Sequence, residues 1–171
     1  MTPAPHGPSG QGGRPLNMRR AVRALMLDDD EHVLLVRFEF PTATVWALPG
    51  GGLDPGEDDE TGLRRELREE LGLHEVPIGP RIWTRDHVIP MRTGHDGQRD
   101  HIHLVRTGRF EPLPEIGWDA LRDELVHEMR WWTVDEIEAA TTTRFAPGRL
   151  AELVRRLLTE GPPEEPIDTG I

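Results

Sequence analysis

The sequence predicts a mixed α/β domain, and three observations lead to that fold class. Leu63, Leu67 and Leu71 recur every fourth residue among strong helix formers, which predicts an amphipathic helix in the middle of the chain. Short runs rich in Val, Leu and Ala, typical of strands, lie on both sides of it. A second amphipathic helix begins after Pro147 and ends at Gly161. Strands around a central helix, with a long helix at the end, indicate a sheet packed against helices.

The two ends of the chain differ in composition from its middle. Residues 1–17 are rich in Pro, Gly and small polar residues with little to bury, so we expect a disordered leader. The folded domain is expected to span residues 18–160. Residues 161–171 are acidic and contain several prolines, and we expect a disordered tail.

A hairpin is expected at the start of the domain. Residues 19–26 and 32–38 carry the apolar runs of two strands, and the acidic segment Asp28 to Glu31 separates them. The aspartates favour a solvated turn over a metal site, because turns select Asp for local hydrogen bonding.

A half-buried strand is expected at residues 100–106. His101 and His103 lie on one face of it, and Ile102 and Leu104 on the other. The two histidines are candidates to line a substrate cleft.

Composition excludes several classes of function. With 20 basic and 31 acidic side chains, the 171-residue chain has a net charge of −11, which argues against a general binder of nucleic acid or anionic membrane. It has no cysteine, hence no disulfide, thiolate metal site or cysteine nucleophile. No apolar run approaches membrane-spanning length and the N-terminus lacks a hydrophobic signal core, so we expect a cytoplasmic protein.

Three carboxylates converge on one flank of the central helix. Glu66, Glu69 and Glu70 occupy positions i, i+3 and i+4, beside the leucine stripe. Like charges so close destabilise a helix, and a divalent cation removes the difficulty, because Mg²⁺ and Mn²⁺ prefer carboxylate oxygens. Gly62 lies on the same side, where a missing side chain leaves room for a ligand.

The segment around these carboxylates resembles a known signature. Five residues separate Gly51 from Glu57 and seven more separate Glu57 from Arg65, after which the chain runs Arg-Glu-Leu-Arg-Glu-Glu-Leu-Gly-Leu to Leu73. This pattern resembles the complete Nudix box, and the resemblance extends in outline over residues 18–160. It implies the Nudix-type α/β/α sandwich, with a mixed β-sheet between helices, and often a homodimer.

The resemblance also implies roles for individual residues. Glu66 and Glu70 are expected to bind Mg²⁺ or Mn²⁺, while Glu69 is either a third ligand or the base that takes a proton from water. A backbone carbonyl of Gly50 or Gly51 is a further candidate ligand.

Other candidates surround this set. Glu57 is expected to orient Arg65 or a metal-bound water. Glu124 and Glu128 are alternative bases, because related enzymes often draw a carboxylate from the loop before the last strand. Arg23 and Arg37 are candidates to bind phosphate, although they could equally flank strands and face water.

These residues predict a metal-dependent hydrolase that cleaves a phosphoanhydride bond. Its small-molecule substrate would be a nucleoside diphosphate linked to another moiety, either a nucleotide sugar such as ADP-ribose or a nucleoside triphosphate. One alternative is a non-catalytic sensor or regulatory Nudix domain that binds a nucleotide derivative. The other is a purely structural helix stabilised by ion pairs between its arginines and glutamates.

Overall fold

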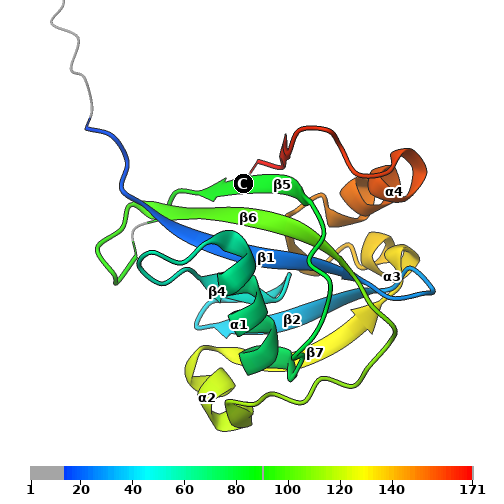
Figure 1. Ribbon diagram of the computed structural model, residues 1–171, viewed down its shortest axis with the longest axis horizontal. Helices are drawn as coiled ribbons and strands as arrows, with labels where there is room; N and C mark the ends of the chain where they lie inside the picture. The colour runs from blue at the N-terminus through cyan, green and yellow to red at the C-terminus, as the bar shows by residue number, and fades with distance from the viewer. Residues whose placement is uncertain (1–13, 90, 171) are drawn as a thin grey trace, which may run out of the picture.

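The computed structural model describes residues 14–89 and 91–170 (Figure 1). Most of the expected leader, residues 1–13, lies outside this range. The described residues form one nine-stranded mixed sheet in the order β8-β3-β2-β1-β6-β5-β9, with β4 also paired to β1 and β7 to β2. The strands are β1 (Met18–Leu27), β2 (Val33–Phe40), β3 (Ala43–Ala47), β4 (Gly50–Gly52), β5 (Arg81–His87), β6 (Gly97–Arg106), β7 (Val126–Trp132), β8 (Arg144–Ala146) and β9 (Ile167–Asp168). The helices are α1 (Asp59–Leu71), α2 (Gly117–Asp123), α3 (Val134–Ala139) and α4 (Leu150–Glu160).

The central strand β1 contributes to the core on both of its faces. Helix α1, in front of the sheet in Figure 1, packs its leucines against Val22, Ala24 and Met26. On the opposite face, Leu25 and Leu27 belong to the cluster that includes side chains of α3 and α4. Successive residues of a strand point to opposite faces, so Arg19, Ala21 and Arg23 lie on the face away from α1. The sheet is therefore covered by helices on both sides.

Helix α1 has well-defined ends. The side chain of Asp58 accepts a hydrogen bond of 2.7 Å from the Thr61 amide at the start of the helix. Gly72 ends it in the left-handed conformation, with φ of 72°. The helix predicted from the leucine spacing is confirmed, and no helix among the described residues is long and apolar enough to cross a membrane.

The first two strands, expected to form a hairpin, pair with each other only next to the turn. Their only registered partners are Leu27 and Val33, next to the turn. From there β2 turns away to pair with β3 and β7, while β1 pairs along its whole length with β6, in parallel. The predicted turn is present, but the main partner of β1 is a strand distant in sequence.

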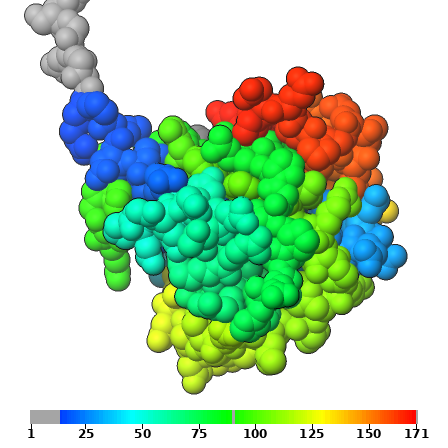
Figure 2. Space-filling view, viewed as in Figure 1, coloured from blue at the N-terminus to red at the C-terminus, as the bar shows by residue number. Residues whose placement is uncertain are grey.

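The C-terminal segment corrects a second expectation. Residues 161–171 were expected to be disordered, yet Ile167 and Asp168 form β9, which pairs in parallel with Trp83 and Thr84 of β5. Thr169 is only 5% exposed. The open edge of β5 offers unpaired backbone groups, which a short strand can satisfy whatever its composition. Figure 2 shows this segment in red against the orange α4 and the green β5.

Candidate active site

The glycine strand β4 lies between β1 and α1. Its pairing places Gly51 opposite Val22 and Gly50 opposite Arg23. On the helix side, the amide of Gly50 donates a hydrogen bond of 2.9 Å to Glu70. A β-carbon at Gly51 would lie 2.5 Å from the carboxylate of Glu66, so only glycine allows this approach. The fixed spacing between glycines and glutamates thus reflects direct contact between the two segments.

Arg65 joins the rest of the cluster. Its guanidinium donates two hydrogen bonds of 2.9 Å to the two carboxylate oxygens of Glu57, and one of 3.0 Å to the carbonyl of Gly52. It donates a further bond of 2.8 Å to Glu66. Hydrogen bonds from Arg65 and from the Asp54 amide lower the pKa of Glu57 to about 2. Arg65 thereby fixes the start of the helix and one side of the Glu66 carboxylate.

Two of the three helix carboxylates are largely buried. Glu70 is 3% exposed and the side chain of Glu66 is 12% exposed, whereas that of Glu69 is 31% exposed. Burial raises the pKa of Glu70 to about 8, against the opposing effects of Arg23 and the Gly50 amide, and nearby Glu66 and Glu124 raise it further. Burial also raises the pKa of Glu66, although Arg65 opposes the shift.

These donors fit a divalent cation. Buried carboxylates with raised pKa values lack sufficient positive charge around them, and hard oxygen donors are what Mg²⁺ and Mn²⁺ prefer. Among the described residues, the one set of three or more acidic or histidine groups with ligand atoms within 4.8 Å of one another lies elsewhere, at Asp28, Asp30 and His32. The ligand atoms of the α1 glutamates are more widely spaced than this limit.

The comparison with known proteins agrees with this geometry. A family model described as NUDIX domain matches residues 17–155. The chain belongs to this family. It is 35% identical over 92 residues to the nucleoside triphosphatase NudI of Salmonella agona, a match that covers 51% of the chain and 64% of that protein, less than two thirds of its length.

Solved structures confirm the predicted Nudix fold. The crystal structure of the MutT NUDIX hydrolase from Burkholderia pseudomallei is 26% identical, with a TM-score of 0.51, and the similarity covers 69% of this chain and 84% of that one. The solution structure of the E. coli ORF135 protein has a TM-score of 0.58 at 23% identity, covering 92% of this chain and 100% of that one. At such low identity the second likeness supports the fold alone.

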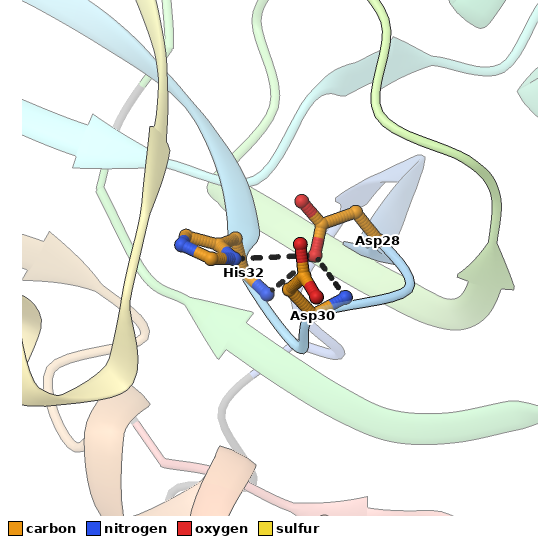
Figure 3. Close-up of side chains that lie close together, drawn as sticks. All are labelled: Asp28, Asp30 and His32. Atoms are coloured by element: carbon orange, nitrogen blue, oxygen red, sulfur yellow. Dashed lines mark hydrogen bonds and ion pairs between the residues drawn. The ribbon is translucent and has the colours of Figure 1, made fainter.

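The Asp28 cluster of this Nudix domain is a turn whose acidic centre is already satisfied. Asp30 and His32 surround Asp28 in Figure 3, and their backbone amides donate hydrogen bonds of 2.9 and 2.8 Å to one of its oxygens. The Nε of Arg109 donates a bond of 2.7 Å to the other oxygen. Burial raises the pKa of Asp28, but these hydrogen bonds outweigh it and the net shift is downward. The residues therefore form the turn that the sequence favours over a metal site, but its central carboxylate is buried and not solvated.

Arg23 lies at the edge of the Nudix site. Its guanidinium donates hydrogen bonds of 2.6 Å to the carbonyl of Gly50 and 3.4 Å to that of Leu48. One candidate metal ligand, the Gly50 carbonyl, is thus already engaged by the protein. Burial raises the pKa values of Glu66 and Glu70, and the positive charge of Arg23 opposes part of this rise.

The structure separates the two loop glutamates. Glu128 lies 3.0 Å from the Nε of Arg37, which also pairs with Glu39 at 2.6 Å. Glu124 follows α2, and its charge raises the pKa of Glu70. Within residues 14–89 and 91–170, Glu124 has no ion pair or side-chain hydrogen bond, so its carboxylate is available near the candidate ligand Glu70. Arg37 is committed to Glu39 and Glu128, which argues against its expected phosphate role.

The two histidines of β6 contact the start of α1 instead of the glutamates. His101 Nδ1 lies 2.7 Å from a carboxylate oxygen of Asp59, and His103 Nε2 lies 3.3 Å from the same oxygen. The other ring nitrogen of His103 lies 3.1 Å from the carbonyl of Gly79. These contacts attach α1 to the sheet, and we therefore do not retain the histidines as substrate ligands.

The space at Gly62 is also occupied by protein. A β-carbon there would collide with the side chain of Leu53 and lie 3.0 Å from a carboxylate oxygen of Glu57. The space left by the missing side chain is filled by Leu53 and Glu57. The prediction that this space would hold a ligand is therefore wrong.

Proposed function

We propose that this chain is a metal-dependent Nudix pyrophosphohydrolase that cleaves a nucleoside triphosphate to a nucleoside monophosphate and pyrophosphate. One observation carries the proposal: two buried carboxylates, Glu66 and Glu70, meet a glycine strand with too little positive charge around them. The name of the Salmonella agona relative, nucleoside triphosphatase, supports triphosphates over nucleotide sugars.

Side chains of α1 have different roles in the proposed reaction. Glu66 and Glu70 would hold Mg²⁺ or Mn²⁺, which would shield phosphate charge and activate a bound water. Arg65 and the Gly50 amide orient these two carboxylates. A carbonyl of Gly51 remains a candidate ligand beside them.

Two residues can accept the proton of the attacking water. Glu69 lies on the same helix and is only weakly held by Arg65, at 3.4 Å. Glu124 approaches from the end of α2. Glu128, the third candidate from the sequence, is paired with Arg37 at 3.0 Å and is therefore not proposed as the base.

A substrate panel with matched variants tests the proposal. Purified protein with Mg²⁺ or Mn²⁺ is given nucleoside triphosphates and ADP-ribose, and pyrophosphate and phosphate release are followed. We expect triphosphate cleavage, and a fall in kcat of about 100-fold or more in Glu69→Gln or Glu124→Gln, whichever is the base. Glu128→Gln is the control and should stay within about threefold of the wild type. Nucleotide binding without any cleavage would instead support the sensor alternative.

Two further features stay predictions. The cytoplasmic location follows from composition alone, and a homodimer follows only from the family resemblance. Size-exclusion chromatography with light scattering would decide the second.

A further inference from the structure

A group of polar side chains lies on the face of the sheet that points away from α1. Arg19 and Arg23 come from β1, Gln98 and Asp100 from β6, and Arg85 from β5. The strand register sets Ala21 opposite Asp100 on one side and Arg85 opposite Asp100 on the other. The sequence carries one signal for this group that is easy to miss: Asp100 shares the face of Ile102 and Leu104, where an acidic residue is unexpected.

Asp100 is the centre of this group, which we call the arginine face. Asp100 is 4% exposed, and its two carboxylate oxygens lie 3.5 Å from Arg23 Nε and 3.5 Å from Arg85. Gln98 donates a hydrogen bond of 2.8 Å to Asp100 and accepts one of 3.2 Å from Arg19. A β-carbon at Gly52 would collide with the guanidinium of Arg19, so the glycine strand also borders this group.

The arginine face carries more positive charge than its own acid can neutralise. The guanidinium groups of Arg23 and Arg85 flank the Asp100 carboxylate, and Arg19 adds a third positive charge beside Gln98, in a chain whose net charge is −11. His87 adds no further cation at neutral pH, because burial and then the charge of Arg85 lower its pKa. Of the glutamates of α1, Glu66 and Glu70 feel the charge of Arg23, which opposes the rise in their pKa values.

Arg85 is the least satisfied member. Its side chain is 13% exposed, and of its five N–H donors only one makes a hydrogen bond among the described residues, the long contact to Asp100. Its Nε is fully buried with no partner in that part of the chain. Buried guanidinium groups normally find several acceptors, so the open donors at the tip of Arg85 favour an anionic ligand.

The arginine face is connected to the proposed metal site. Gly50 donates to Glu70 through its amide and accepts from Arg23 through its carbonyl, and Arg23 in turn contacts Asp100. Arg23 therefore links the proposed metal site, through Gly50, to Arg85, through Asp100.

We infer that Arg85 and Arg23, positioned by Asp100, bind the part of a polyphosphate chain that extends beyond the metal-held phosphates. This rests on the proposed function and specifies it: the site selects a triphosphate over a sugar-linked diphosphate. Asp100 is a positioning residue, and Arg85 is the residue that contacts the substrate.

Binding and kinetics together test the inference. Calorimetry with inorganic tripolyphosphate and Mg²⁺ measures affinity without turnover, and nucleoside triphosphate kinetics separates KM from kcat. Arg85→Gln should weaken tripolyphosphate binding and raise KM by roughly 10- to 100-fold, with kcat nearly unchanged. Arg85→Lys, which keeps the charge but not the planar fork, should recover only part of the loss.

A matched control comes from the opposite face of the neighbouring strand β6. Arg99 is paired with Asp86 by hydrogen bonds of 2.7 and 2.5 Å, so Arg99→Gln removes one positive charge outside the arginine face. Its tripolyphosphate affinity should equal that of the wild type. An equal loss in Arg99→Gln and Arg85→Gln would overturn the inference, since overall charge would then explain both.

The variant Asp100→Asn tests whether Asp100 positions Arg23 and Arg85 or only lowers the positive charge of the site. If Asp100 positions the arginines, the variant binds tripolyphosphate more weakly even though the site has become more positive. Tighter binding would overturn the positioning role. If the wild type cleaves no nucleotide and Arg85→Gln binds tripolyphosphate more weakly than the wild type, the proposed function is refuted and this inference stands. If the wild type cleaves triphosphates and the KM of Arg85→Gln is unchanged, this inference is refuted and the proposed function stands.

Discussion

Asp28 and Glu70 are each only 3% exposed to solvent, but their surroundings differ. Asp28 accepts hydrogen bonds from two backbone amides and from Arg109, and its pKa is lowered despite burial. Glu70 accepts one hydrogen bond, from Gly50, and its pKa is raised to about 8. The donors around Asp28 outweigh the effect of burial, whereas Glu70 has fewer donors and a larger effect of burial, so that it is not complete within the protein. The Asp28 turn is complete, and the Glu70 site is not.

The largest expected effect is the loss of nucleotide cleavage in Glu70→Gln, which Asp28→Asn should not share. Glu70→Gln keeps the shape of the side chain but removes its charge, so a metal ligand is lost. We expect nucleotide cleavage to fall by on the order of 100-fold or more, while the metal-free variant is at least as stable as the wild type. Steady-state kinetics and urea unfolding in EDTA measure the two quantities. Full activity in the variant would remove Glu70 from the site.

The reverse pattern is expected for Asp28→Asn. Loss of the charge leaves Arg109 without its acceptor and weakens the bonds to the turn amides, so the free energy of unfolding should fall by about 2 kcal/mol. Activity at 25 °C should change little, because the turn does not contact the α1 glutamates. Urea unfolding checks the first expectation. A loss of activity without a loss of stability would mean that the turn takes part in catalysis.

The two acids should also respond to pH in opposite directions. The pKa of Asp28 in the folded state lies below its ordinary 3.8, so its contribution to stability is present above that pH and is lost as pH falls through the lowered value. The pKa of Glu70 rises from 4.5 to about 8, so the metal-free folded state binds more protons and loses stability as pH rises between those values. Unfolding in EDTA from pH 5 to 8 should show this loss in the wild type and a shallower slope in Glu70→Gln. Parallel slopes would contradict the account.

The smallest effect concerns the backbone of the Asp28 turn. Glu31 has a positive φ of 63°, which a non-glycine residue adopts at a cost. Glu31→Gly should therefore stabilise the protein by up to about 1 kcal/mol, and Glu31→Asn by less. Thermal unfolding measures the difference. Destabilisation by glycine would mean that the Glu31 side chain contributes more than its backbone costs.

The helix and its glutamates were predictable because their signals are local. Leucine spacing, Asp58 at the start and Gly72 at the end all act within a few turns of α1. The turn at Asp28 was predictable for the same reason. Each of these features depends on residues that are neighbours in sequence.

Contacts between distant segments could not be predicted in this way. The pairing of β1 with β6 joins strands far apart in the chain, and only this pairing brings Asp100 beside Arg23. The attachment of His101 to Asp59 and the pairing of Glu128 with Arg37 likewise depend on the tertiary fold. A strand pattern gives the face on which a side chain lies, but not its partner across that face.

Metal binding by the two acids is the most direct test of the central claim. Melting temperature is measured against Mg²⁺ concentration for the wild type, Asp28→Asn and Glu70→Gln. We expect Mg²⁺ to raise the melting temperature of the wild type and of Asp28→Asn by the same amount, and Glu70→Gln to lose this response. A response that survives in Glu70→Gln and disappears in Asp28→Asn would place the metal at the turn and contradict the account.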